Sequence, residues 1–308
     1  MPQNLMEQLH FAHVKFELQL VRADGNAYQN LLWTVLSKIH PKFGPVKPHG
    51  NAGDRKNDGF CRESGIYYQA YAPEEPESKM IEAAEKAKTD FTGLLSFWQS
   101  ISPIREYRFA FNDKGRGSYP DLFKTLAEIK KTHGIECTPF MFNHLLDAFK
   151  NLAPLDQVDI VGILPNAANL QTIDFKEFSD LLQHVLGSDA GVPRDEILRA
   201  PGFDEKIKFN GLTPKVGLLL TKGSWQSGLV EKFFERQSAV SRQAVRDKLS
   251  AMYSKLRASA PPLSGDQIFF ALLDLIAPTR NSRAQDAVIV LLAFFFESCD
   301  VYEEPTLA

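Results

Sequence analysis

The sequence predicts an α/β domain with a mixed sheet, followed by an α-helical domain. Two observations carry this prediction. Segments with strand-like alternation interchange with segments of helical spacing over residues 13–165, which is typical of an α/β layer. After residue 205, apolar residues recur only at helical spacing. The predicted domains are therefore 13–165 and 205–308, joined by a helix and loop over 166–204.

Three segments are predicted as strands. Residues His13–Val21 alternate apolar and polar side chains, and so do Arg105–Asn112. The segment Tyr67–Tyr71 follows a loop rich in Gly and Asp and is rich in Tyr, a residue type that is enriched in strands. With a further short strand at the loop that holds Asp58, the order of elements, β-α-β-β-α-β-α, predicts one mixed sheet.

The helices of the first domain follow from apolar residues spaced three and four apart. In the first of them, Tyr28, Leu32 and Val35 share one face, and Pro41 with Gly44 ends the pattern. The predicted helices cover residues 26–44, 77–101, 121–132 and 139–152. Residues 156–166 are compatible with either a short strand or a helical turn.

The second domain is predicted to be helical throughout. Residues 172–187 form one helix, and residues 228–260 hold one or two more. Ser264 and Ser282 each precede an apolar run and are predicted N-caps of the last two helices. Stretches rich in Gly, Pro and Asp place the boundary between domains within residues 165–205.

Composition excludes several classes of protein. The chain has 308 residues, 44% hydrophobic and 24% charged, with a net charge of −3, so disorder and a general attraction to nucleic acid are not expected. Three distant cysteines and no secretory signal predict a cytoplasmic protein without disulfides. The longest apolar run, Ala287–Phe296, is too short to span a membrane. Histidine and cysteine spacing offers no zinc site.

The loop "GDRKNDGF" and the strand "IYYQAY" after it hold the candidate site. Asp58 stands immediately before a short apolar stretch, and Gln69 lies within the next strand. An acid at a strand end with a second oxygen ligand on the neighbouring strand is an arrangement that holds a divalent metal. The alternative is that these acids cap turns of their own loop, which is common in such loops.

The loop frame, made by Gly50, Gly53, Asp54, Asp58 and Gly59, resembles that of Mrr-like nucleases of the PD-(D/E)xK class. The resemblance implies a restriction-endonuclease-like fold with Asp58 as the metal-binding acid and Gln69 in the next position. It also implies a lysine where this chain has Tyr71, and a helix glutamate where it has Gln29.

These departures argue against an active enzyme. A single carboxylate holds Mg²⁺ weakly, because the ion prefers several hard oxygen ligands. Lys56 could replace the missing lysine in space, or be a solvated loop residue. The sequence therefore predicts no cofactor, or Mg²⁺ if the site is active. Arg55 and Lys56 are candidate contacts for a DNA phosphate.

Taken together, the N-terminal loop, "KIKFNGL" at 206–212 and "LLAFFFESCDVYEEP" near the C-terminus resemble components of bacterial ABC-three-component (ABC-3C) conflict systems. The resemblance implies two partners, an ABC-type ATPase and a small middle component, and a role in defence against phage. Three functions remain open: a non-catalytic or weakly catalytic subunit, a metal-dependent DNA nuclease using Asp58, and a plain assembly adaptor.

Two charged segments of the second domain are candidate contacts. Residues 201–260 carry eleven Lys and Arg against five Asp and Glu, which suits DNA, an acidic partner or simply a solvated helix face. The acidic tail after the last helix opposes the helix dipole. Asp300, Tyr302 and Glu303 are therefore predicted to bind a partner, with an internal salt bridge as the alternative.

Overall fold

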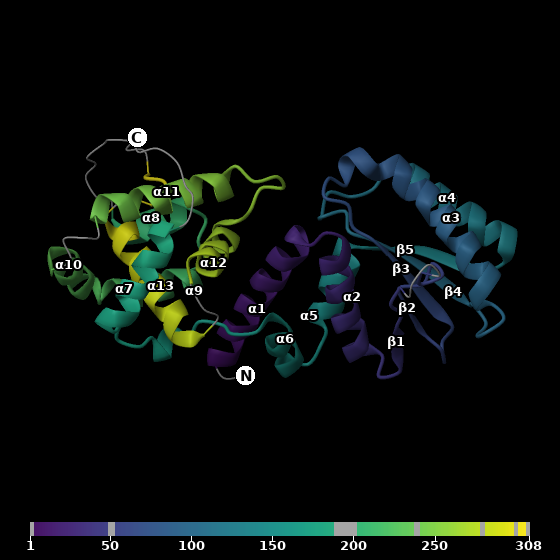
Figure 1. The fold of residues 1–308 in the computed structure, drawn as a ribbon, viewed down its shortest axis with the longest axis horizontal. Helices are drawn as coiled ribbons and strands as arrows, with labels where there is room; N and C mark the ends of the chain where they lie inside the picture. The colour runs from purple at the N-terminus through teal and green to yellow at the C-terminus, as the bar shows by residue number, and fades with distance from the viewer. Residues whose placement is uncertain are drawn as a thin grey trace. The chain divides into compact units, whose positions relative to one another are not determined.

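A computed structural model describes residues 3–48, 53–187, 202–236, 241–277, 281–298 and 301–305. The chain forms two compact units (Figure 1). One, here called the α/β unit, comprises Gln19–Ile160. The other, the helical unit, comprises Met1–Leu18 together with Val161–Ala308. The predicted α/β domain, residues 13–165, thus extends a few residues beyond the observed unit at both ends. Its sheet agrees with the predicted α/β class, while the nuclease-like fold stays a prediction.

The α/β unit is built on one five-stranded sheet in the order β1-β2-β3-β4-β5. β1 (Phe43–Pro45), β2 (Gly59–Cys61) and β3 (Ile66–Tyr71) pair antiparallel. β3, β4 (Glu106–Phe111) and β5 (Glu136–Met141) pair parallel. The loop that holds Asp58 therefore joins two neighbouring strands of one mixed sheet, as the sequence predicted.

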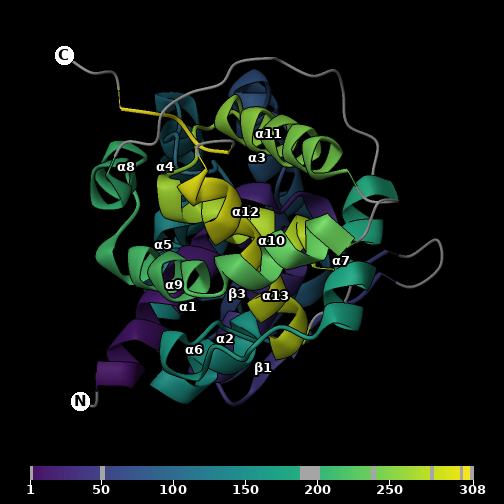
Figure 2. The same ribbon diagram turned by 90° about the vertical axis from the view of Figure 1, so that its left-hand side faces the viewer.

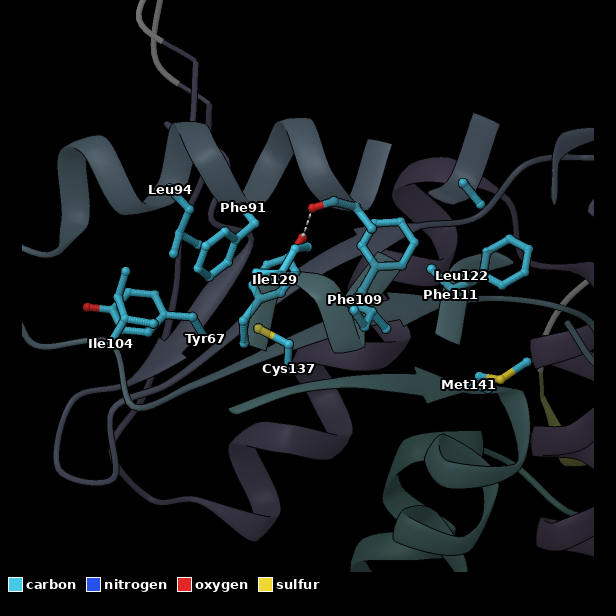
Figure 3. Close-up of a cluster of buried hydrophobic side chains, with 14 of the residues drawn as sticks. Tyr67, Phe91, Leu94, Ile104, Phe109, Phe111, Leu122, Ile129, Cys137 and Met141 are labelled. Carbon is cyan, nitrogen blue, oxygen red and sulfur yellow. Dashed lines mark hydrogen bonds between the residues drawn. The ribbon is translucent and has the colours of Figure 1, made fainter. Parts of the chain in front are cut away.

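Helices cover both faces of this sheet. α3 (Met80–Trp98) and α4 (Pro120–His133) pack on one face, over the cluster in Figure 3 that includes Tyr67, Phe91 and Phe109. On the other face, α2 (Gly25–Ile39) contacts β3 and α5 (Phe142–Lys150) contacts β5. Side chains alternate along β3, so Tyr67 belongs to the first face while Tyr68 contacts Phe43 and Phe140 on the second.

Two predicted elements of this unit are wrong. Residues 13–21 lie in helix α1 (Gln3–Arg22), not in a strand. The helix passes from one unit to the other between Leu18 and Gln19, so its apolar residues serve two cores and imitate alternation. The predicted helix 139–152 begins only at Phe142, because Glu136–Met141 forms β5. Pro139 is tolerated there since β5 is an edge strand.

The helical unit contains the start of α1 and the helices after residue 161. Within the described part of the chain these are α7 (Phe175–Gly187), α8 (Phe203–Phe209), α9 (Pro214–Ser224), α10 (Ser227–Arg236), α11 (Arg242–Arg257), α12 (Gly265–Ile276) and α13 (Ser282–Glu297). Ser264 caps α12 as predicted, whereas Asn281 caps α13 in place of Ser282. α6 (Pro154–Val161) forms a helix where the sequence left strand or turn open.

α13 is the centre of the helical unit. Its residues are buried from Gln285 to Phe296, and α9 packs closely along it. Gly223 of α9 makes this approach possible, because a Cβ there would lie 2.9 Å from the Cβ of Ala293. No helix in the described ranges is both long and apolar enough to cross a lipid bilayer.

Candidate functional site

The loop before β2 adopts a strained backbone conformation. Arg55 and Lys56 have φ angles of 56° and 63°, in the left-handed region that non-glycine residues seldom occupy. Asp54 supports this turn, because its Oδ1 accepts the backbone N–H of Lys56 at 2.8 Å. Asp54 therefore caps its own loop, while the two basic residues after it are held in a costly conformation.

Asp58 is buried, and both of its carboxyl oxygens accept hydrogen bonds. Oδ1 accepts from the side-chain amide of Gln29, and Oδ2 accepts from the backbone N–H of Ala70 at 2.6 Å. The backbone N–H of Asp58 donates to the carbonyl of Tyr68 at 3.0 Å. The carboxyl group of Asp58 thus contacts Ala70 of β3, the residue after Gln69.

Burial raises the pKa of Asp58 to about 7, against the bond from Ala70, which lowers it. Asp54 and Asp90 raise the pKa further by repulsion, and Lys86 lowers it by attraction. At neutral pH the group is therefore divided between its acid and its carboxylate form. A neutral carboxyl is a poor ligand for a divalent cation, which prefers ionised oxygen.

Tyr71 stands at the position where the resemblance to Mrr-like nucleases implies a lysine. Its hydroxyl donates to Glu82 of α3 at 2.8 Å, and burial raises its pKa above the ordinary value. The ammonium of Lys86 lies 5.7 Å from the centroid of the Tyr71 ring. A lysine from the neighbouring helix thus stands next to the residue that replaces the expected one. Gln69 itself is buried, and its Oε1 has no hydrogen-bond partner within the described chain.

Asp90 of α3 joins the site and was missed by the sequence reasoning. Its side chain is 2% exposed, and each oxygen faces one ammonium: Lys56 at 2.9 Å and Lys86 at 2.7 Å. We call this the Lys56–Asp90–Lys86 cluster. A signal was available, since Asp90 falls at helical spacing among Ala83, Ala87 and Phe91, where an apolar residue is expected.

Gly93 lets the loop approach α3 at this point. A Cβ on Gly93 would lie 2.8 Å from Cγ of Lys56, so any larger residue requires the lysine side chain to move. The Lys56 side chain is half exposed, while its ammonium is held by Asp90. Its bond to Asp90 is also the main reason why its pKa is raised.

A surface cavity of about 420 Å³ opens beside the cluster, lined by Gly53, Asp54, Arg55, Lys56, Gly93, Ser96 and Phe97. The guanidinium of Arg55 lies 5.2 Å from the centroid of the Phe97 ring, in cation–π geometry. Arg55 and Lys56 thus both line this cavity, but the ammonium of Lys56 is paired with Asp90.

The donor set does not fit Mg²⁺ in this arrangement. Both oxygens of Asp58 face N–H groups, and both oxygens of Asp90 face ammonium groups. No group of three or more His, Cys, Asp and Glu in the described segments is placed to hold a metal. A cation entering here would have to displace two lysines, which carry the same sign of charge.

The predicted partner residues near the C-terminus lie in different surroundings. Tyr302 is buried, and its ring lies 4.8 Å from that of Tyr253 and 5.2 Å from that of Phe296. Glu303 pairs with Arg257 at 3.1 Å, on the surface. Asp300 falls outside the described residues. Tyr302 thus packs in the core, and Glu303 makes the internal salt bridge that the sequence analysis named as the alternative.

Comparison with protein families gives one match. Residues 176–303 match the family model of C-terminal domain 10 of the ABC-three component (ABC-3C) systems, which is less than half of the chain. No curated protein and no solved structure matches the chain. The matched region begins in α7 and ends at Glu303, so it lies entirely within the helical unit. The match supports a component of an ABC-3C system.

Proposed function

We propose that this chain is a non-catalytic subunit of an ABC-3C defence complex, acting with an ABC-type ATPase and a small middle component. The family match over residues 176–303 supports membership of such a system. The observation that carries the non-catalytic role is the Lys56–Asp90–Lys86 cluster beside Asp58, whose own oxygens are engaged. The α/β unit then serves as a structural or recognition module.

Metal-dependent cleavage of DNA is the second candidate. Its support is that the ammonium of Lys86 in α3 is close enough to Asp58 to lower the pKa of that carboxyl and lies over the ring of Tyr71. A carboxylate and a lysine are residue types that such nucleases use. For this activity Lys56 and Lys86 would have to release the oxygens of Asp90, so that these oxygens could face a cation together with Asp58. The engaged oxygens favour the first candidate over this one.

A plain assembly adaptor is the third candidate. It shares the partners of the first but gives the loop around Asp58 no role at all. Arg55 and Lys56 distinguish the two, because a recognition module would use them to contact a phosphate backbone at the cavity. Glu303 could contact a partner only by releasing Arg257, and Tyr302 only by leaving its packed position.

The test is to express the chain with the ABC-type ATPase and middle component encoded beside it, and to isolate the complex. The complex is then incubated with plasmid DNA and Mg²⁺ or Mn²⁺. We expect a stable complex whose effect on DNA is the same for wild type and Asp58→Asn. Cleavage that disappears in Asp58→Asn would establish the nuclease instead. If no complex forms with either protein, the proposed subunit role is wrong.

A further inference from the structure

The outward face of α9 carries two apolar and two basic side chains in one row. These are Lys215, Leu218, Lys222 and Trp225, spaced three, four and three residues apart. Residues at this spacing lie on one face of a helix. Trp225 is the C-cap residue and keeps helical backbone angles, so the row continues to it. We call this row the α9 stripe. α9 and its neighbour α8 are in view in Figure 2.

The opposite face of α9 packs in the core of the helical unit. Val216, Leu219 and Leu220 are fully buried, and Gly217 and Gly223 permit close approach of Ile207 and Ala293. The helix is therefore fixed against α13 by one face only. The α9 stripe faces away from that contact, so its side chains contribute little to the fold.

The apolar members of the stripe are exposed to solvent. Trp225 is 69% exposed and Leu218 is 42% exposed. Met6 of α1, which is 50% exposed, adjoins the stripe, because its carbonyl accepts a hydrogen bond from Lys215 at 3.1 Å. Tryptophan is largely buried in most folded proteins and is enriched where one protein binds another. This apolar surface therefore marks a contact.

The basic members of the stripe make no ion pair with any residue that the structure describes. Among the described residues, neither Lys215 nor Lys222 forms an ion pair with a carboxylate: Lys215 bonds a carbonyl, and the ammonium of Lys222 lies 3.8 Å from the Trp225 ring centroid. The cation–π contact holds the indole ring in place before any partner arrives. Two ammonium groups seven residues apart, next to exposed Leu and Trp, favour a partner that is acidic and partly apolar.

We infer that the α9 stripe is the docking site for an acidic amphipathic helix of a partner protein. The three-four-three spacing is that of a seam between two packed helices, so a helix is the occupant that matches it. Its acidic residues would pair with Lys215 and Lys222, and its apolar residues would cover Leu218 and Trp225. The inference rests on the proposed function in one respect: the partner belongs to the same complex.

The experiment measures the affinity of the chain for the complex of ATPase and middle component at two salt concentrations. We expect Trp225→Ala to weaken binding by roughly 30-fold, as a central tryptophan does in other interfaces. Lys215→Glu with Lys222→Glu is expected to weaken it at least as much, and to remove most of its salt dependence. The matched control is Lys248→Glu with Lys255→Glu in α11. These lysines are also seven residues apart and have no carboxylate partner in the described chain. We expect this control to leave the affinity within about twofold of wild type.

The outcomes separate the inference from the proposed function. If the complex forms and both α9 variants bind as wild type does, the docking site is wrong while the subunit role stands. If no complex forms, both are wrong. Two further measurements test whether a lipid surface or a second copy of the chain occupies the α9 stripe instead. Binding of the chain alone to phosphatidylglycerol vesicles that is lost in the α9 variants, or a self-association that they abolish, would replace the partner helix by a lipid surface or a second copy.

Discussion

Basic side chains are used differently in the two units. In the α/β unit, Lys56 and Lys86 point their charges inward to the buried carboxylate of Asp90. In the helical unit, Lys215 and Lys222 have no carboxylate partner in the described chain, and Lys222 lies beside the exposed ring of Trp225. The charges around the loop that resembles a catalytic motif are thus paired within the unit, while the ammonium groups of α9, a helix with no motif, are not paired with a carboxylate in the described chain. The α9 stripe is therefore better suited to bind a partner than the Lys56–Asp90–Lys86 cluster.

The strongest way to break this contrast is to remove the ammonium groups that neutralise Asp90. Replacing both Lys56 and Lys86 with Met leaves a buried carboxylate without a counter-charge, which costs about 3–5 kcal/mol of unfolding free energy. Urea denaturation measures the change. The control, Lys88→Met with Lys124→Met, removes the same charge from exposed positions that make no ion pair in the described chain, and is expected to stay within about 0.5 kcal/mol. A similar small effect for both pairs would show that Asp90 needs no counter-charge.

The pH dependence of stability sharpens the account of Asp58. Its pKa is about 7 in the folded chain against 3.8 for the ordinary group. The folded chain therefore retains a proton that the unfolded chain has released, and stability falls as pH rises from about 4 to about 7. Asp58→Asn removes this penalty. The titration of Asp58 accounts for about 4 kcal/mol between pH 4 and pH 8. Allowing about 2 kcal/mol at every pH for one altered hydrogen bond, we expect a gain of roughly 2 kcal/mol at pH 8 and a loss of roughly 1–2 kcal/mol at pH 4.

Thermal or urea unfolding of wild type and Asp58→Asn across pH 4–8 checks this expectation. The difference between the two proteins should grow with pH. A difference that is constant across the range would mean that Asp58 titrates normally in the folded protein, and the argument that it is a poor metal ligand at neutral pH would lose its basis.

How far the sequence could predict this site depends on the kind of contact. Asp58 and Gln69 could be proposed because a strand order and a loop frame are local patterns; in the structure the carboxyl of Asp58 contacts β3 at Ala70, next to Gln69. Asp90 was missed because it lies in a regular helix, where the pattern predicts an apolar face and hides one acid. Its role depends on Lys56, 34 residues earlier, and long-range pairs of this type leave no spacing to read.

Other differences have equally physical causes. α1 was predicted as a strand because it serves two cores, and β5 was hidden by Pro139, which only an edge strand accommodates. Tyr302 was expected at the surface because acids surround it, yet it adopts a left-handed φ of 76° and packs into the core. The basic excess over residues 201–260 was seen, but singling out Lys215 and Lys222 required knowing which face of α9 is buried.

A substitution at Gly93 tests, with a smaller expected effect, whether Lys56 packs against α3. Replacing an interior helical glycine with alanine ordinarily gains about 1 kcal/mol. In the wild type, the new Cβ would displace Lys56 from Asp90, so we expect little or no gain. In a Lys56→Ala background the full gain should return. Equal gains in both backgrounds, measured by urea denaturation, would mean that Lys56 does not occupy the space next to Gly93.

The smallest expected effects lie on the surface of the helical unit. Arg257→Ala removes the exposed ion pair with Glu303 and should cost less than about 1 kcal/mol. Trp225→Ala should change stability by no more than about 0.5 kcal/mol, since most of the ring is exposed. Thermal unfolding measures both. A large loss of stability in Trp225→Ala would assign the ring to the fold and remove it as a contact for a partner.

One measurement compares the two regions directly: protection against phage in cells that carry the complete system, with either Asp58→Asn or Lys215→Glu/Lys222→Glu in this chain. Deletion of the gene sets the level of no protection. We predict that Asp58→Asn protects as wild type does and that the α9 variant falls to the level of the deletion. The reverse result, with protection lost in Asp58→Asn and kept in the α9 variant, would contradict the account and identify the α/β unit as the catalytic centre.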